Sequence, residues 1–169
     1  MKIRRSALVL ILFALVNVLA VSCRRNPSES AGSVDTSAPA RPPMSEEDAR
    51  AFVEKFTRAM NSKDNLQLVR MTASDGKFLI ATGAGTGTET MDSAKFLKWF
   101  QGLLKDAGNY SVEIKSMTYA GRPGGAEVTA DLLQEVSTGF KKWSGRTKIK
   151  FTIEDRPDRG VVCTRMEGA

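Results

Sequence analysis

Residues 147–153 read Thr-Lys-Ile-Lys-Phe-Thr-Ile, which is the most regular stretch of the chain. Side chains alternate there with a period of two, the pattern of a β-strand that buries one of its faces. The face expected to point inward carries Thr147, Ile149, Phe151 and Ile153, and the lysines fall on the opposite face. This strand therefore predicts a sheet with one side in the core and one side in water.

The segments on either side of this strand extend the same pattern. Residues 110–119 and 126–132 also place apolar side chains at alternate positions, and a glycine- and proline-rich turn at 121–125 separates them. After the strand at 147–153, a turn at 155–160 leads to a last strand at 161–166. Strands joined by tight turns pair antiparallel, so the sequence predicts a four-stranded antiparallel meander.

Two helices are expected before the sheet. Ser45 is followed by three acidic residues, which is typical of a helix N-terminus. The apolar positions that then recur at helical spacing are Ala49, Phe52, Val53, Phe56, Ala59 and Met60. Leu66 and Val69 indicate a second, short helix, and Ser74-Asp75-Gly76 is interpreted as a turn.

A strand pair and a third helix connect this region to the meander. Residues 77–82 predict a strand and residues 86–90 a short returning strand. A helix is expected from about Met91 to Lys105, with Asp92 or Thr90 as its N-cap and Gly108 as its C-cap.

The order of these elements, and the first helix above all, resembles a known superfamily. Ala51-Phe52-Val53-Glu54-Lys55-Phe56, the polar break at residues 61–64 with its aspartate, and the short helix after it are similar to the opening of NTF2-like (SnoaL-like, cystatin-like) domains. The resemblance covers about residues 45–167. It implies an α+β cone, in which three N-terminal helices pack on a curved antiparallel sheet of about four to six strands. It also implies a pocket on the concave side, but no particular reaction, because no catalytic set matches residue by residue.

The N-terminus has the pattern of an export signal. Basic residues precede an apolar run from Ala7 to Leu19, and small residues lead to Cys23. Ser22-Cys23 resembles the end of a bacterial lipobox, which implies a signal peptide at residues 1–22 and a lipidated Cys23. Residues 23–43 are then a tether rich in Ser, Ala and Pro, and residues 44–169 form the domain. Plain secretion and an uncleaved anchor remain as alternatives.

This export signal predicts a protein on the extracytoplasmic side of the cell envelope. Lipid would hold it to the membrane, because several acyl chains together anchor firmly. Arg24 resembles outer-membrane sorting signals, which applies if the cell has two membranes.

Five aromatic residues are the candidate lining of an apolar pocket: Phe96, Trp99, Phe100, Tyr110 and Phe151. An ordinary core needs the same residue types, so a core role remains the favoured alternative. Trp99 and Tyr110 each carry a polar atom that needs a partner when it is buried.

Catalytic groups are harder to find in the sequence. Histidine is absent from the chain, and Cys163 lies in an apolar strand, where a buried thiol is expected. Asp75, Asp131 and Glu135 are candidate carboxylates, although strand alternation places Asp131 on the outer face. The Gly83–Gly87 loop lacks the spacing and the parallel-strand context of a dinucleotide site. No metal site and no cofactor are expected.

These observations favour a binding domain over an enzyme. The net charge of +6 includes the basic residues of the signal, and the basic cluster at residues 141–150 is typical of solvated strands, so no nucleic-acid partner is expected. A small apolar ligand or an envelope protein is the expected partner. A pocket enzyme of the isomerase, dehydratase or hydrolase type, using a carboxylate or tyrosine, is the alternative. A dimerisation or scaffold module is the second alternative. The oligomeric state is not predicted, and a homodimer is one possibility.

Overall fold

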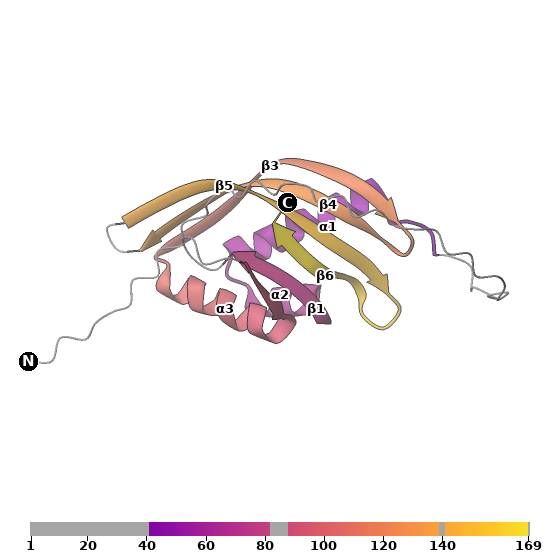
Figure 1. Ribbon diagram of the computed structural model, residues 1–169, viewed down its shortest axis with the longest axis horizontal. Coiled ribbons are helices and arrows are strands. Elements are labelled where there is room, and N and C mark those ends of the chain that lie inside the picture. Colours follow the sequence, from indigo (N-terminus) through magenta and orange to yellow (C-terminus); the bar gives the residue numbers. More distant parts are fainter. Residues whose placement is uncertain (1–40, 82–87, 139–140, 169) are drawn as a thin grey trace, which may run out of the picture.

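The described residues form three helices and one six-stranded sheet (Figure 1). The structure is a computed structural model and describes residues 41–81, 88–138 and 141–168. Its elements are α1 (Glu46–Asn61), α2 (Asn65–Met71), β1 (Thr72–Ala81), β2 (Thr88–Asp92), α3 (Ser93–Asp106), β3 (Asn109–Arg122), β4 (Gly125–Thr138), β5 (Lys141–Arg156) and β6 (Gly160–Gly168). The predicted α+β class is confirmed.

Helix α1 follows the predicted pattern closely. Ser45 is its N-cap, and the Ser45 hydroxyl oxygen accepts a hydrogen bond from the Asp48 backbone N–H at 3.1 Å. All six apolar positions predicted for its inner face are buried. The helix ends at Asn61, whose side-chain amide bonds both backbone groups of Val112 on β3 at 2.7 and 2.9 Å. These bonds fix α1 against the edge strand of the sheet.

Helix α2 is confirmed, but its buried face is not formed by the apolar residues that indicated it. Leu68 and Met71 are buried, whereas Leu66 and Val69 are 62% and 47% exposed. Asp64 caps the helix through the backbone N–H of Gln67 at 2.9 Å. With only seven residues, α2 makes too few turns for spacing alone to identify its inner face.

The sheet is mixed, which corrects the expectation of a fully antiparallel sheet. Its strand order is β2-β1-β6-β5-β4-β3, and the meander from β3 to β6 pairs antiparallel as predicted. Strand β1 pairs parallel with β6. Strand β6, the last of the meander, pairs with β5 on one side only. Strand β1, which follows α2, pairs with the other side of β6 and runs in the same direction.

The expected turn at Ser74-Asp75-Gly76 is also wrong, since these residues lie inside β1. The pairing of β1 with β6 shifts register between Thr72 and Lys77, so they form a bulge. A Cβ at Gly76 would come within 2.8 Å of the Phe78 ring and 3.0 Å of the Ala73 carbonyl oxygen. The glycine therefore permits a close approach within a strand rather than a chain reversal.

Helix α3 begins as predicted and ends differently. Asp92 caps it by accepting a hydrogen bond from the Lys95 N–H at 2.8 Å. Its C-cap is Ala107 in an extended conformation, not Gly108. The N–H of Gly108 instead donates to the Ser137 carbonyl at 2.7 Å, so the chain passes directly into the sheet.

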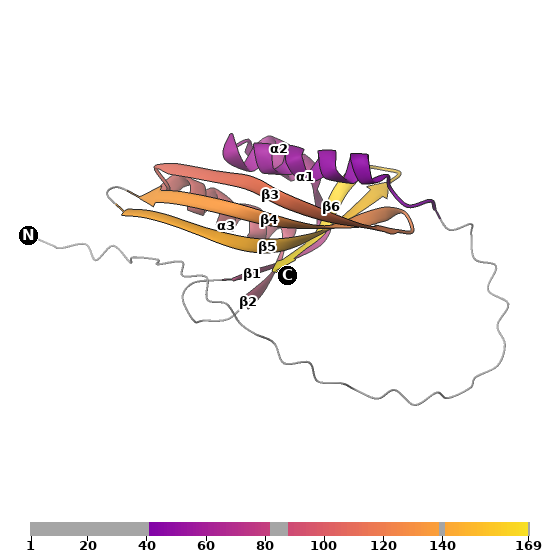
Figure 2. The same cartoon turned by 90° about the horizontal axis from the view of Figure 1, so that it is seen from above.

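The core lies between the helices and the inner face of the sheet. In Figure 2, α1 runs along β3 and β4. Helix α3 contacts β1 and β2. Aromatic rings join the layers: Phe56 of α1 meets Phe151 of β5 edge-on at 5.8 Å, and Phe78 of β1 stacks on Phe96 of α3 at 4.4 Å.

The domain has two ends, which we name proximal and distal. We call proximal the end where the chain enters, formed by residues 41–44 and the β3–β4 and β5–β6 turns. The Met44 N–H donates to the Gly125 carbonyl at 3.0 Å, and the Tyr119 hydroxyl donates to the Met44 carbonyl. We call distal the opposite end, where α3 passes into β3 and where β4 ends and β5 begins (Figure 1).

Several predicted features lie outside the described residues: the signal peptide, Cys23, most of the tether and the Gly83–Gly87 loop. The short returning strand is present as β2, starting at Thr88. Among the described residues, no helix combines the length and the apolar character needed to cross a bilayer.

Candidate functional site

The inner face of β5 changes character along the strand. Phe151 and Ile153 are fully buried in the core, whereas Trp143, Gly145, Thr147 and Ile149 are only half-buried. The described part of β6 ends opposite Ile149, so the distal half of β5 pairs only with β4. The inner face of β5 is thus less buried at its distal end than at its centre, and we call these four positions the distal strip.

Gln134 of β4 lies beside this strip. It follows the buried inward residues Ala126, Val128, Ala130 and Leu132 in strict alternation, and it is 9% exposed. Within the described residues its side chain makes no hydrogen bond. Among the described residues, Thr72 Oγ1 is the only side-chain nitrogen or oxygen that is fully enclosed and has no hydrogen-bond partner. The amide atoms of Gln134 have no partner either, so they are not fully enclosed and remain in contact with solvent. A nearly buried amide with no protein partner is uncommon in a folded domain.

Trp143 provides an apolar surface next to this amide. Gly145 is directly opposite Gln134 in the β4–β5 ladder. A Cβ at Gly145 would lie 2.6 Å from Trp143 Cζ2, so the indole occupies the space that a side chain at 145 would need. Residues that face each other across two strands are neighbours on the sheet surface. The indole and the Gln134 amide are therefore side by side.

The five aromatic residues predicted to line a pocket all belong to the core or pack against it. Phe96, Phe100, Tyr110 and Phe151 are buried, and Trp99 is half-buried. Phe96, Trp99 and Phe100 contact one another along α3, and Phe100 meets Tyr110 edge-on at 5.7 Å. Phe151 lies apart from this group, against Phe56. Their role as ligand contacts stays a prediction.

Burial controls the chemistry of two ionisable groups in this interior. It raises the pKa of the Tyr110 hydroxyl well above its usual range, which keeps that group neutral. It also raises the pKa of the Cys163 thiol to about 12, and this cysteine is fully buried. A thiol that stays protonated at neutral pH is a poor nucleophile.

The candidate carboxylates lie outside the cone. Asp131 and Glu135 share the outer face of β4, where they lie opposite Lys148 and Ser144 of β5 in the ladder. Asp75 is on the β1 bulge and receives a hydrogen bond from Arg156 at 2.6 Å, which lowers the pKa of its carboxyl. This arrangement corresponds to a solvated surface rather than to a desolvated acid or base.

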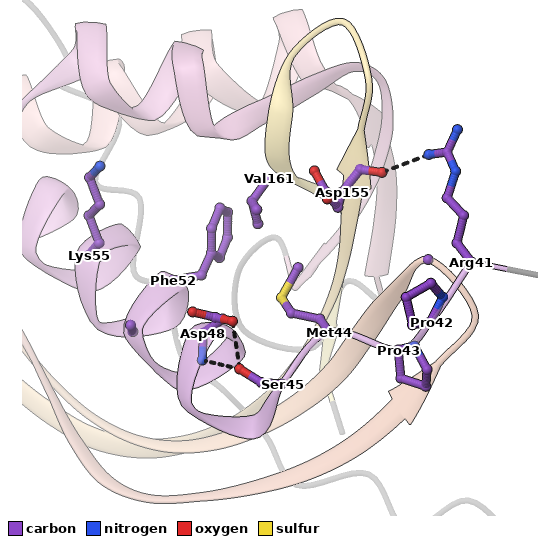
Figure 3. A pocket seen from close by; sticks show the side chains of 12 residues that line it. Arg41, Pro42, Pro43, Met44, Ser45, Asp48, Phe52, Lys55, Asp155 and Val161 are labelled. Atoms are coloured by element: carbon purple, nitrogen blue, oxygen red, sulfur yellow. Dashed lines mark hydrogen bonds between the residues drawn. The ribbon is translucent and has the colours of Figure 1, made fainter.

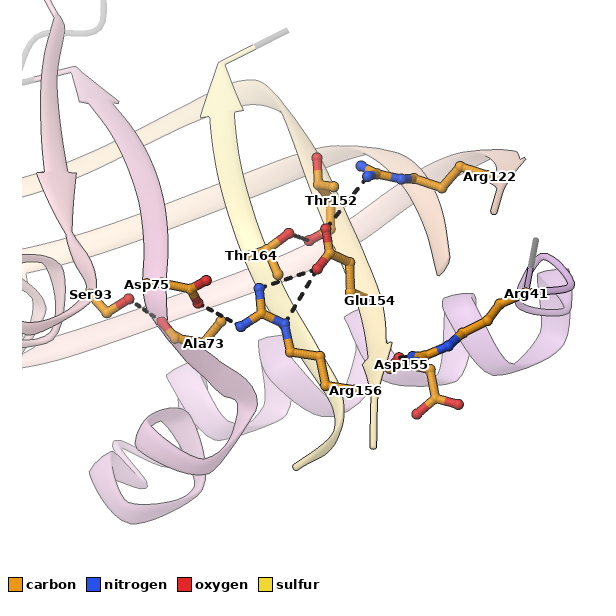
Figure 4. A network of polar contacts seen from close by, with 10 residues as sticks. All are labelled: Arg41, Ala73, Asp75, Ser93, Arg122, Thr152, Glu154, Asp155, Arg156 and Thr164. Atoms are coloured by element: carbon orange, nitrogen blue, oxygen red, sulfur yellow. Dashed lines mark hydrogen bonds and ion pairs between the residues drawn. The ribbon is translucent and has the colours of Figure 1, made fainter. Parts of the chain in front are cut away.

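Figure 4 shows that Asp75 belongs to a network of ion pairs across the sheet. Arg156 also contacts Glu154 at 3.2 Å, and Glu154 lies 3.5 Å from Arg122. The network links the ends of β3 and β5 to β1. The two arginines and two carboxylates of the network neutralise each other, so none of these four charges is left unpaired for catalysis. Such exposed ion pairs stabilise the position of the strands only modestly. Among the described residues, no group of three acidic or cysteine side chains is placed to hold a metal ion.

An open hollow of about 510 Å³ lies at the proximal end (Figure 3). Its larger apolar side chains include Met44, Phe52 and Val161, and Asp48 and Lys55 of α1 also line it. The Arg41 guanidinium bonds the Asp155 carbonyl oxygen at 3.1 Å. Ser45 and Asp48 of this hollow also bond each other, so several of its polar groups are engaged with the protein, in contrast to Gln134.

Sequence reasoning missed Gln134, Trp143 and Gly145. The signal for Gln134 was present, because it continues the inward alternation of residues 126–132 as the first large polar residue. The position of Trp143 over Gly145 depends on side-chain direction, which alternation does not give.

Solved structures similar to this chain show which fold it has. A protein with a cystatin-like fold from Caulobacter vibrioides matches with a TM-score of 0.61 and 14% identity, over 73% of this chain and 87% of that one. A candidate dehydratase from the NTF2-like family of Streptomyces avermitilis gives 0.62 and 11%, over 72% and 93%. A candidate ketosteroid isomerase from Shewanella frigidimarina gives 0.58 and 12%, over 73% and 96%. No protein-family model and no curated sequence matches the chain. The NTF2-like fold expected from the resemblance is confirmed.

Proposed function

We propose that this protein is a non-catalytic binding domain, tethered to the extracytoplasmic side of a membrane, that holds a small and mainly apolar ligand at its distal end. The observation that carries the proposal is the distal strip, where the inner face of β5 leaves the core and is only half-buried. Concave, mainly apolar surfaces with few polar groups are typical of small-molecule sites.

The surroundings of the distal strip support this role. Val136 of β4 faces Trp143 of the strip across the ladder, and its partly buried side chain adds apolar surface there. A ligand the size of a substituted benzene that covers about 150–200 Å² of apolar surface gains roughly 4–5 kcal/mol. Losses of translational freedom offset part of that gain, so we expect dissociation constants of about 1 mM or above for simple aromatic probes.

The chemistry of the interior supports binding without turnover. Acid–base catalysis needs an ionisable group close to the substrate with its pKa near the working pH. The candidate carboxylates lie on outer surfaces, and the interior groups Tyr110 and Cys163 are held neutral. Turnover of any substrate, abolished by one substitution in the distal strip, would overturn this part of the proposal.

The proposed anchor suits this placement of the ligand site. The chain enters the domain at the proximal end, so lipid on Cys23 would attach the membrane tether to that end and leave the distal end free of it. The segment from Cys23 to Arg41 reaches at most about 60 Å when fully extended. A ligand would thus be taken up from the surrounding aqueous space.

The ligand site can be tested with p-xylene, which has no polar group. In methyl NMR spectra of labelled protein, p-xylene should shift the signals of Val136 and Ile149 at the distal end. Val161, which lines the proximal hollow, is the internal control and should not move. Shifts confined to Val161, or no shifts at all, would contradict the proposal.

The anchor can be tested separately in cells. We expect mass spectrometry to find acyl chains on a mature N-terminal Cys23, and Cys23→Ser to release the protein from the membrane fraction. A Cys23→Ser protein that stays on the membrane would refute lipid anchoring and leave the ligand site untouched.

A further inference from the structure

Gln134 is a polar group in a place where the fold needs an apolar one. Its neighbours on the inner face of β4 are Leu132 and Val136, and across the ladders it faces Val112 and Gly145. The side chain is nine-tenths buried, yet it makes no hydrogen bond within the described residues, and its amide keeps contact with accessible space. An unpaired amide there weakens the fold compared with a leucine of similar size.

A structural role would leave a different signature. The neighbouring amide of Asn61 shows that signature, because it bonds the N–H and the carbonyl of Val112 at 2.7 and 2.9 Å. Gln134 lies opposite the same residue on the next strand and bonds neither group. Its hydrogen-bonding capacity is therefore not used by the described part of the protein.

We propose that the Gln134 amide is the polar anchor of the distal site, and that the ligand is a flat, mainly apolar molecule with one neutral hydroxyl, carbonyl or amide group. This inference rests on the proposed ligand-binding function. The ring of the ligand lies against the half-buried Trp143 indole, and its polar group reaches Gln134 beside it.

The chemistry of the site favours a neutral polar group. A primary amide both donates and accepts, so it matches a hydroxyl, a carbonyl or another amide. The described side chains around it on β3, β4 and β5, such as Tyr110, Val136 and Thr147, carry no charge at neutral pH. A charged ligand group would lose its hydration there without gaining an opposite charge.

Two probes of nearly the same shape separate this inference from simple apolar binding. p-Cresol differs from p-xylene by a hydroxyl in place of one methyl group. In a purely apolar site p-cresol binds more weakly, because its hydroxyl loses water without compensation. In the wild-type protein we expect p-cresol to bind at least as tightly as p-xylene, since the hydroxyl gains a hydrogen bond to Gln134.

The variants Gln134→Leu and Gln134→Met remove the amide and keep an apolar side chain of similar length. Each should weaken p-cresol binding by about five- to tenfold, the usual effect of one neutral hydrogen bond, and leave p-xylene binding unchanged or tighter. Glu135→Ala, which changes an exposed residue on the outer face of the same strand, is the matched control and should change neither affinity.

A spectroscopic readout on the wild-type protein does not depend on how the variants fold. The side-chain NH₂ pair of Gln134, identified by its loss in Gln134→Met, should shift with p-cresol and stay in place with p-xylene. The exposed Gln101 is the internal reference and should not move. Equal affinities of wild type and Gln134→Met for p-cresol, with a stationary NH₂ pair, would overturn this inference while p-xylene binding upholds the proposed function. If neither probe moves the distal methyl groups, both fail.

Discussion

Replacing Phe151 by alanine tests whether the aromatic interior is a packed core or the wall of a ligand pocket. Phe151 is 1% exposed on the inner face of β5, and its ring meets Phe56 edge-on at 5.8 Å. Removing a fully packed phenylalanine costs about 3–5 kcal/mol, because the transfer free energy and the new cavity add together. The ring pair accounts for about 0.5–1.5 kcal/mol of this cost.

The free energy of unfolding, obtained from guanidinium denaturation followed by circular dichroism, should fall by that amount in Phe151→Ala. A melting temperature about 10–20 °C lower is expected for a domain of this size. Leu66→Ala is the control, since Leu66 is 62% exposed and its truncation should change stability by less than about 0.5 kcal/mol. A loss below about 1.5 kcal/mol in Phe151→Ala would refute the packed core and favour the pocket-lining role that the sequence suggested.

Three further predictions concern single contacts. Asn61→Ala removes two hydrogen bonds to Val112 and should lower the free energy of unfolding by about 1–2 kcal/mol, measured by the same denaturation; no change would mean that water replaces the amide fully. Gly145→Ala places a Cβ 2.6 Å from the Trp143 indole, so the ring must move: its fluorescence emission should shift and p-cresol should bind more weakly, whereas an unchanged emission would contradict the position of the ring. Burial raises the pKa of the Cys163 thiol from 9.0 to about 12, so the thiol stabilises the fold fully below pH 9 and this contribution is lost between pH 9 and 12, as the unfolded thiol ionises first. Between pH 8 and 10 the wild type should therefore lose about 1.4 kcal/mol more than Cys163→Ala, and equal losses would show that the folded thiol ionises normally.

The sequence predicted those elements whose pattern is long enough to identify the inner face. Helix α1 and the strands β3, β4 and β5 repeat their apolar positions over many residues; the predicted inward residues of α1 and β4 are buried, as are Phe151 and Ile153 of β5. Helix α2 is too short for such a repeat, and its exposed leucine and valine gave the wrong face. The β1 bulge was interpreted as a turn because glycine next to Ser and Asp is common to both structures.

The candidate site was less accessible to prediction, because it depends on how far each inward residue is buried. Alternation gave Ile149 and Phe151 the same inward direction, and only the structure shows that one is half-buried and the other buried. The parallel pairing of β1 with β6 also depends on tertiary packing and has no local signal. The unpaired amide of Gln134 required knowledge of every neighbour that could bond it.

Crystals soaked with 4-bromophenol would test the account most directly, because the bromine atom can be located by its anomalous scattering. We predict a bromine peak at the distal end, with the ring beside Trp143 and the hydroxyl within hydrogen-bond distance of the Gln134 amide. A peak in the proximal hollow near Phe52 and Val161, or a distal strip that stays empty at millimolar probe, would contradict it.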